Sequence, residues 1–359
     1  MELQEQLSWK ARFREVAESL GFIKVGFTGA QPLLDLTQYL KGTEKEGCFT
    51  PFVEADITLR TDPQAVWAAC KTVVVLAYPL PLTSKSQPNE GVLARSSVGE
   101  DYHHVLHSRL DKLLQKLREI NWPSEQIQLQ VDTGPLNERG FALRSGLGWA
   151  GRNQQLIVPG VGSFVALALV FLDQELPPDE PMDNLCGTCQ KCIQSCPAQV
   201  LGKEHFVATQ CLSFLTQSKE RLSDGQAKSL GQRLFGCDTC QEACPHNQGF
   251  LRREEEAQNK VQRQSYNRTE GVSYSDEATC LRRGADLYEV LNLTKAQFNE
   301  RFRWTAAGWR GKGILQRNAY RIMENLQDER RIAWLNENKD NQTLPLVLRQ
   351  ELMGKNKDR

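Results

Sequence analysis

The sequence has no net charge, no long apolar run and no apolar stretch near its first residue. Among its 359 residues, Lys and Arg total 44 and Asp and Glu total 44, so the formal net charge is zero. A globally basic nucleic-acid-binding protein is therefore not indicated, although a local basic face remains open. The longest apolar run, SFVALALVFL from Ser163, is far shorter than the roughly 18 residues of a membrane span. The charged, amphipathic N-terminal segment lacks the apolar part of a signal peptide, so we expect a cytoplasmic protein without membrane contacts.

Cysteine is the residue type that stands out, with eleven copies. In a cytosolic protein, cysteines are more often metal ligands or free thiols than disulfides. The stretch CGTCQKCIQSCP from Cys186 has the C-x2-C-x2-C-x3-C-P spacing of bacterial ferredoxins, in which the fourth cysteine ligates the other cluster. A second stretch, GCDTCQEACP from Gly236, has three cysteines. The sequence therefore predicts two [4Fe–4S] clusters, one held by Cys186, Cys189, Cys192 and Cys244 and the other by Cys196, Cys211, Cys237 and Cys240.

The alternative for these cysteines is zinc, because pairs of C-x-x-C also bind Zn²⁺ tetrahedrally. Zinc sites do not need the additional C-x3-C-P, so the spacing favours clusters. Cys211 is assigned as the eighth ligand because it lies between the two stretches. Cys48, Cys70 and Cys280 fall outside the pattern, and Cys70, in an apolar segment, is expected in the core.

Helical and strand patterns alternate up to about residue 175, which predicts an α/β or α+β domain. Helices are expected at 3–20, 62–70, 101–120 and 135–146, the last with Pro135 in its first turn. The segment after the cysteines is polar and then helical to the end. We predict an α+β protein with an N-terminal α/β domain (1–180), a ferredoxin-like two-cluster module (181–250) and a helical, HEAT-like C-terminal region (251–359).

Several segments together resemble the epoxyqueuosine reductase family, which completes the synthesis of queuosine in tRNA. The resemblance covers essentially the whole chain. The segments that carry it are LRTDP from Leu59, DYH from Asp101, VDTGPLNERGFALRSGLGWAGRN from Val131, GCDTCQEACPHN from Gly236 and the late GWRGKGILQRNAYRIMEN. The segment from Val131 is far more specific than the cysteine frame, although Arg152 stands where Lys is expected more often.

The resemblance implies a cobalamin bound by the N-terminal domain beside the first cluster. It also implies that epoxyqueuosine at the wobble position of tRNA is the substrate, and that its epoxide oxygen leaves as water. This reaction consumes two electrons and two protons, which requires an external low-potential electron donor. No D-x-H-x-x-G corrinoid signature is present, so a histidine lower ligand to cobalt is not indicated.

Asp132 has two possible roles. It precedes Thr-Gly-Pro and an expected helix, a position that suits a helix N-cap. The resemblance instead implies a catalytic acid that protonates the opening epoxide. That role requires the pKa of Asp132 to be raised by burial, because an ordinary carboxyl is ionised near neutral pH.

The three glycines of SGLGWAGRN permit close backbone approach to a ligand, although a plain loop explains them equally well. With the resemblance, we expect Gly151 and Asn153 to contact the corrin, and we regard Arg60, Tyr102 and Ser145 as weaker candidates. Tyr102 could equally be a packed helix residue. His103 and His104 are expected at the surface or in the core rather than as metal ligands.

Residues 301–331 contain eight Lys and Arg and three Asp and Glu, with Trp304, Trp309 and Tyr320 interleaved. Such a face can hold phosphates and stack bases, whereas a solvated charged helix is the plain alternative. In a tRNA enzyme the first reading is favoured. The predicted RNA contacts are Arg310, Lys312, Arg317 and Arg321.

Two other functions remain open at this point. The chain could be an electron carrier whose larger domain only docks a redox partner. It could also resemble the corrinoid reductive dehalogenases, although the exported members of that class usually have a twin-arginine leader, and the sequence begins without one.

Overall fold

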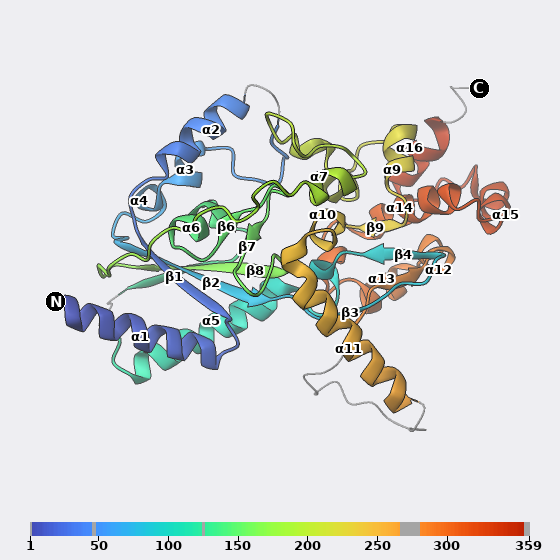
Figure 1. Cartoon of the computed structure of the whole chain (residues 1–359). Coiled ribbons are helices and arrows are strands. Elements are labelled where there is room, and N and C mark those ends of the chain that lie inside the picture. Colours follow the sequence, from blue (N-terminus) through green and yellow to red (C-terminus); the bar gives the residue numbers. More distant parts are fainter. Residues whose placement is uncertain (1, 45–47, 124–125, 266–280, 355–359) are drawn as a thin grey trace.

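The protein is described here from a computed structural model that covers residues 2–44, 48–123, 126–265 and 281–354 (Figure 1). At its centre is a four-stranded sheet in the order β1-β2-β8-β5, in which every neighbouring pair is antiparallel. Its strands are β1 (Lys24–Gly29), β2 (Thr72–Pro79), β5 (Ile127–Gln130) and β8 (Val165–Leu172). The prediction of an α+β fold is confirmed, and the sheet is antiparallel rather than parallel.

Alternate residues of the central strands point to opposite sides of the sheet, and both sides are covered by helices. Val74 and Leu76 of β2 pack with the helices α1 (Leu3–Ser19) and α5 (Tyr102–Glu119). Val73 and Val75 pack on the other side with α6 (Glu138–Arg144), and Figure 1 shows these two helical layers. Helix α5 presents a buried stripe of Leu106, Leu110, Leu113 and Leu117 at helical spacing. Each fully buried leucine contributes about 1.5–3 kcal/mol to this packing.

Two of the expected helices are shorter than their sequence patterns suggest. The helix expected at 62–70 is only α4 (Pro63–Val66), although Cys70 is fully buried as predicted. The helix expected from Pro135 begins at Glu138, so the placement of Pro135 in its first turn is wrong. The side chain of Asn137 caps α6 by accepting a hydrogen bond from the amide of Gly140 at 2.9 Å. This cap satisfies an amide that the helix leaves without a partner, and so it sets where α6 begins.

Two small sheets join segments from all three predicted domains. In one, β4 (Glu90–Leu93) lies between β9 (Arg233–Phe235) and β11 (Gly284–Asp286). In the other, β3 (Thr83–Ser84) pairs with β10 (Leu281–Arg282). Segments on either side of the predicted boundaries at 180 and 250 therefore hydrogen-bond to one another. That each of the three predicted domains folds independently stays a prediction.

Short elements complete the N-terminal and cysteine-rich parts. These are α2 (Leu34–Glu44), α3 (Ile57–Thr61), the 3-10 helix η1 (Arg95–Ser97), β6 (Trp149–Ala150), β7 (Leu156–Ile157), α7 (Lys191–Ser195), η2 (Ala208–Gln210), α8 (Leu212–Leu215), α9 (Asp224–Ser229), α10 (Thr239–Glu242) and η3 (Pro245–Asn247). The C-terminal part is helical as expected. Besides β10 and β11, it consists of α11 (Gln248–Ser265), α12 (Leu287–Leu291), α13 (Lys295–Arg301), η4 (Ala306–Gly308), α14 (Lys312–Asn325), α15 (Arg330–Asn338) and α16 (Leu346–Gly354).

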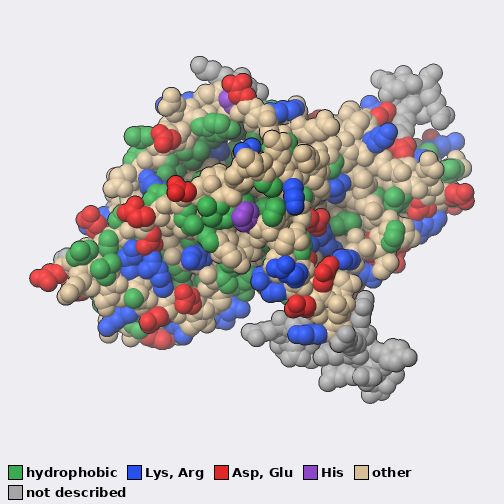
Figure 2. All heavy atoms as spheres, in the orientation of Figure 1, with side chains coloured by type: hydrophobic (Ala, Val, Ile, Leu, Met, Phe, Trp, Pro, Cys, Tyr) green, Lys and Arg blue, Asp and Glu red, His purple; other side chains and the backbone are tan. Residues whose placement is uncertain are grey.

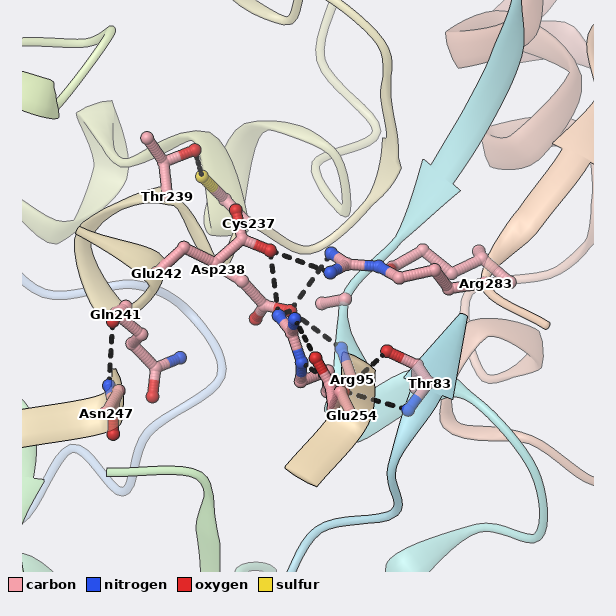
Figure 3. A network of polar contacts seen from close by, with 12 residues as sticks. Thr83, Arg95, Cys237, Asp238, Thr239, Gln241, Glu242, Asn247, Glu254 and Arg283 are labelled. Carbon is pink, nitrogen blue, oxygen red and sulfur yellow. Dashed lines mark hydrogen bonds and ion pairs between the residues drawn. The ribbon is translucent and has the colours of Figure 1, made fainter. Parts of the chain in front are cut away.

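A buried charge network fastens these parts together beside the second cysteine stretch (Figure 3). The guanidinium of Arg95 contacts Glu254 at 2.6 Å, Glu242 at 2.8 Å and Asp238 at 3.1 Å. Arg283 contacts Glu242 at 2.7 Å and Asp238 at 3.2 Å. Removing one partner from a buried ion pair typically costs about 3–5 kcal/mol, so this network fixes the position of the segment that bears Cys237 and Cys240.

None of the helices in the described ranges is long and apolar enough to cross a membrane. Basic and acidic side chains are interspersed over the face shown in Figure 2, in keeping with the zero net charge.

Candidate functional site

Asp132 lies in the turn between β5 and α6, two residues beyond the end of the strand. Its backbone is in the left-handed region, with φ of 49°. Its amide donates a hydrogen bond of 2.7 Å to Oε1 of Glu138, in the first turn of α6. Because Asn137 caps this helix, the N-cap role considered for Asp132 is wrong. The turn instead presents the carboxylate away from the helix, a strained arrangement for which a structural cap gives no reason.

Two side chains from the start of α5 hold the Asp132 carboxylate. Tyr102 donates its hydroxyl to Oδ2 of Asp132 at 2.9 Å, and Nε2 of His103 lies 3.0 Å from the same oxygen. The other ring nitrogen of His103 contacts Oδ1 of Asp101 at 2.6 Å. The rings of Tyr102 and His103 stack with their centroids 4.1 Å apart. Tyr102 therefore lies beside Asp132, as expected for residues of one pocket.

The electrostatics of this group differ from the expectation for Asp132. Its side chain is 57% exposed, and the hydrogen bond from His103 lowers its pKa more than desolvation raises it. The expectation of a raised pKa is therefore wrong for this arrangement, in which Asp132 is ionised. Desolvation lowers the pKa of His103, but the bonds to Asp132 and Asp101 outweigh it and raise this pKa to about 9. The proton is thus held on His103, one hydrogen bond away from Asp132.

The sequence interpretation missed three polar residues of this site. His103 was assigned to the surface or the core, although it belongs to the DYH segment that carried the resemblance. Glu138 lies under the Asp132 turn, and burial together with the charge of Asp132 raises the pKa of Glu138 to about 8. Arg139 donates through Nη1 to the carbonyl of Gln154 at 2.7 Å, which links α6 to the turn that follows Trp149.

The turn from Gly148 to Asn153 has polar atoms that suit a bound cofactor. Nδ2 of Asn153 and Nε1 of Trp149 are buried, and neither has a hydrogen-bond partner among the described residues. Unpaired buried donors are costly, and the amide arms and phosphate of a cobalamin would supply acceptors for them. Gly151 is buried, and a Cβ there would collide with Asn153 and Ile157, so the chain itself requires glycine at this position. The residues of this turn therefore fit the implied cobalamin, with Asn153 as the better-supported contact.

Arg60 and Ser145 are less closely associated with Asp132. Arg60, in α3, is buried with its guanidinium 4.6 Å from the ring centroid of Phe49, and its carbonyl accepts from the amide of Asn137 at 2.9 Å. Ser145 is buried at the C-terminal end of α6, about 10 Å along the helix from Glu138, and its hydroxyl donates to Ala142. Their contacts with a corrin stay predictions.

The eight predicted cluster cysteines fall into two spatial groups. One small cavity is lined by Cys186, Cys189, Cys192 and Cys244. A second cavity is lined by Cys196, Cys211, Cys237 and Cys240. These are the two predicted sets, in which the ferredoxin crossover rule places seven cysteines and the position between the two stretches adds Cys211. Asn153 lines both cavities, so the turn with the unpaired donors lies against both cysteine sets.

The thiols influence one another within the same two sets. Burial, followed by the nearby Cys237 and Cys196, raises the pKa of Cys211 to about 11. Burial, followed by Cys186 and Cys189, raises the pKa of Cys244.

The cysteines outside the two sets are placed differently. Burial raises the pKa of Cys70 to about 12, as expected for a core thiol. Cys48 is also buried, and Cys280 lies outside the described residues.

The prediction that four basic residues contact RNA is wrong for two of them, which are buried. Arg317 is fully buried, and its guanidinium donates to the carbonyls of Glu220 and Leu215 at 2.8 and 2.9 Å. Arg321 is 1% exposed and forms an ion pair with the buried Glu351. Helix α14 is covered on all sides by α9, α12, α16 and β9, so both arginines are buried within the core. Their polar contacts hold α14 against these neighbours. They cannot contact RNA without local unfolding.

The other two residues of the predicted face are half-buried. Nε of Arg310 donates to the carbonyl of Gln217 at 2.9 Å, and Nζ of Lys312 donates to the carbonyl of Leu293 at 3.3 Å. Their contact with RNA stays a prediction.

The sequence of this chain is similar to those of known proteins. A family model described as epoxyqueuosine reductase QueG matches residues 60–133, and one described as a 4Fe-4S double cluster binding domain matches residues 185–247. An epoxyqueuosine reductase of Bacillus anthracis is 33% identical over 87% of this chain and 79% of the relative. One from Listeria monocytogenes is 33% identical over 92% of this chain and 84% of the relative.

Solved structures give the same result. A crystal structure of epoxyqueuosine reductase with an epoxyqueuosine-modified tyrosine tRNA stem loop has a TM-score of 0.81 at 30% identity and covers 97% of this chain and 89% of the other. A Bacillus subtilis epoxyqueuosine reductase with its catalytic aspartate loop swung out of the active site has a TM-score of 0.80 at 30% identity, with the same coverage. With these relatives, the double-cluster match and the Asp132 site in one chain, the protein belongs to the epoxyqueuosine reductase family.

Proposed function

We propose that this protein reduces epoxyqueuosine to queuosine at the wobble position of tRNA. The observation that carries the proposal is the likeness, over 97% of the chain, to a structure that holds an epoxyqueuosine-modified stem loop. In the reaction, both carbon–oxygen bonds of the epoxide break and a carbon–carbon double bond forms. Two electrons and two protons are taken up, and the oxygen leaves as water.

The cysteine sets are proposed to hold the two [4Fe–4S] clusters. Cys186, Cys189, Cys192 and Cys244 hold the first, and the set with Cys211 holds the second. The match to a double cluster binding domain and the two cavities support this assignment. Electrons enter from an external low-potential donor on the side of the second set, where Cys237 also lines a wide cavity of about 1160 Å³.

Cobalamin is proposed as the second cofactor, held by Asn153 and Trp149, with Gly151, Arg60, Ser145 and Tyr102 as further candidate contacts. When bound, it would supply a low-valent cobalt as the two-electron reductant. Asn153 lines both cysteine cavities, so a cofactor on this turn would lie next to the clusters.

Proton delivery is proposed to pass through Asp132. His103 holds a proton and Tyr102 orients the carboxylate, so one of the two protons passes from His103 through Asp132 to the departing oxygen. The substrate and cofactor would cover the exposed carboxylate, and this desolvation favours its neutral, proton-bearing form. Such positioned acid catalysis typically contributes about 10²–10⁴-fold to the rate. A cytoplasmic location follows, because the proposed substrate is tRNA.

The test is anaerobic purification with iron and cobalt analysis, followed by incubation of the chemically reduced protein with epoxyqueuosine-containing tRNA. We expect eight iron atoms and one cobalamin per chain, and conversion of the modified nucleoside to queuosine. Full clusters without cobalamin binding would favour an electron carrier. A fully loaded protein that dehalogenates small organohalides but leaves epoxyqueuosine intact would favour the dehalogenase alternative.

A further inference from the structure

Two tryptophans of the C-terminal part are largely exposed, Trp304 at 60% and Trp309 at 54%. Exposed indole rings are uncommon in soluble proteins and often mark contact surfaces. The ring of Trp309 is already used by the chain. Phe52 packs edge-on against it at 5.1 Å, Arg310 lies over it at 4.7 Å, and its Nε1 donates to Gln217 at 3.0 Å. The ring of Trp304 has fewer such contacts, so more of it is available to a ligand.

The surroundings of Trp304 are cationic and aromatic. The guanidinium of Arg303 lies 5.2 Å from the centroid of the indole ring, and the ring of His104 lies 6.5 Å away, tilted by 53°. Arg303 and His104 are both exposed. An exposed aromatic ring beside an arginine is the arrangement with which proteins stack unpaired bases and hold the adjoining phosphates.

Trp304 is fastened to the group that surrounds Asp132. Its carbonyl accepts a hydrogen bond from the amide of Asp101 at 2.9 Å. Asp101 caps α5 and also contacts His103, which in turn contacts Asp132. Three successive contacts therefore link the backbone of Trp304 to Asp132, the proposed proton-transfer residue.

The base beneath Trp304 is rigid. Phe302 and Ala307, on either side of it, are 4% and 1% exposed and belong to the C-terminal core. The chain turns tightly between them, with the amide of Thr305 donating to Phe302 at 3.0 Å. A Cβ at Gly308 would collide with the carbonyl of Phe302, so the turn is closely packed. Because this turn is already ordered, little backbone entropy is lost when a ligand stacks on the ring that it carries.

We propose that Trp304, with Arg303 and His104, is a stacking platform for an unpaired nucleobase of the anticodon loop, next to the nucleotide that reaches Asp132. The proposal rests on the proposed function and deepens it. It replaces the buried Arg317 and Arg321 with exposed residues as the principal RNA contact. Sequence-specific proteins contact RNA mainly at unpaired loop bases, and a wobble nucleotide lies in such a loop.

The test compares Trp304→Ala, Trp304→Phe and the matched control Trp309→Ala, each loaded with both cofactors. Binding of an anticodon stem loop is measured by fluorescence anisotropy, and quenching of tryptophan emission by the same RNA is recorded in parallel. We expect Trp304→Ala to weaken binding by about 5- to 150-fold, the range for loss of one stacked base. Trp304→Phe should retain most of the affinity, because phenylalanine also stacks. Trp309→Ala should change it by less than about threefold, because the ring of Trp309 is already engaged by Phe52 and Arg310 and its Nε1 by Gln217.

The outcomes separate the platform from the proposed function. If the wild-type protein neither binds nor converts the modified stem loop, the proposed function fails. If the wild-type protein binds it but Trp304→Ala binds equally well with unchanged quenching, the platform alone is refuted. If Trp304→Ala binds RNA normally and loses activity only with a protein electron donor, Trp304 is a protein contact and the inference is overturned.

Discussion

Nε2 of His103 lies 3.0 Å from Oδ2 of Asp132, and the pair is formed by residues 29 positions apart in the sequence. His103 is held on its other side by Asp101, so one imidazolium is shared between two carboxylates. This arrangement stores a proton where Asp132 alone would have none near neutral pH. Both the reaction rate and the stability of the fold should therefore decrease as pH rises and His103 loses its proton.

The rate should depend on His103 more than on the other histidines of α5. In single-turnover conversion of epoxyqueuosine tRNA by chemically reduced protein, His103→Gln should be slower by about 10- to 1000-fold, within the usual range of acid catalysis. Wild-type conversion should fall as pH rises through about 9, where His103 loses its proton, and the variant should lack this limb. His107→Gln, an exposed change on the same helix, should behave as wild type. An identical high-pH limb in His103→Gln would assign the proton to another group.

The same pair should contribute to stability in a defined pH window. The pKa of His103 is about 9 in the folded protein and 6.5 without its partners, so its stabilising effect is complete below pH 6.5 and is lost as pH rises through 9. The lowered pKa of Asp132 acts oppositely, and its effect is lost at acid pH. The difference in urea unfolding free energy between wild type and His103→Gln should therefore be larger at pH 6 than at pH 10. A difference that grows with pH would contradict the ion pair.

The cysteine assignment predicts selective loss of iron. Cys211→Ala should lose one cluster and retain about four iron atoms, because each predicted set holds one four-iron cluster. Cys70→Ala, a change at a buried core thiol, should keep both clusters at some cost in stability. Iron and sulfide analysis after anaerobic reconstitution provides the measurement. Equal iron content in the two variants would refute the role of Cys211.

The buried arginines of α14 predict a loss of stability rather than of RNA affinity. Arg321→Ala leaves the fully buried Glu351 without its ion-pair partner and should cost about 3–5 kcal/mol in urea unfolding. Combining Arg321→Met with Glu351→Met should recover most of that loss, because no buried charge is left unpaired. Arg303→Ala, on the exposed surface, should cost less than about 0.5 kcal/mol. If Arg321→Ala is as stable as Arg303→Ala, the burial of Arg321 is in error.

The sequence predicts local features of this protein well and through-space features poorly. The cysteine spacing predicted the two groups in which these cysteines lie, because short spacings keep most members of each group within one local segment. The pairing of His103 with Asp132 was not predictable, because it depends on how the start of α5 meets the end of β5. The burial of Arg317 and Arg321 was also missed, because charged residues usually indicate a solvent-exposed helix face. Here α14 is buried all round, and partners from distant segments compensate those charges.

The most direct test of the account is single-turnover conversion of epoxyqueuosine tRNA by Asp132→Asn, with the protein reduced chemically so that no donor protein is needed. Asparagine keeps the size of the side chain and one oxygen that can accept from Tyr102 and His103, but it carries no charge and cannot pass on a proton. The account predicts unchanged iron, cobalamin and stem-loop binding, with conversion slower by about 10²–10⁴-fold. Conversion near the wild-type rate would show that the proton reaches the epoxide oxygen by a route that does not include Asp132.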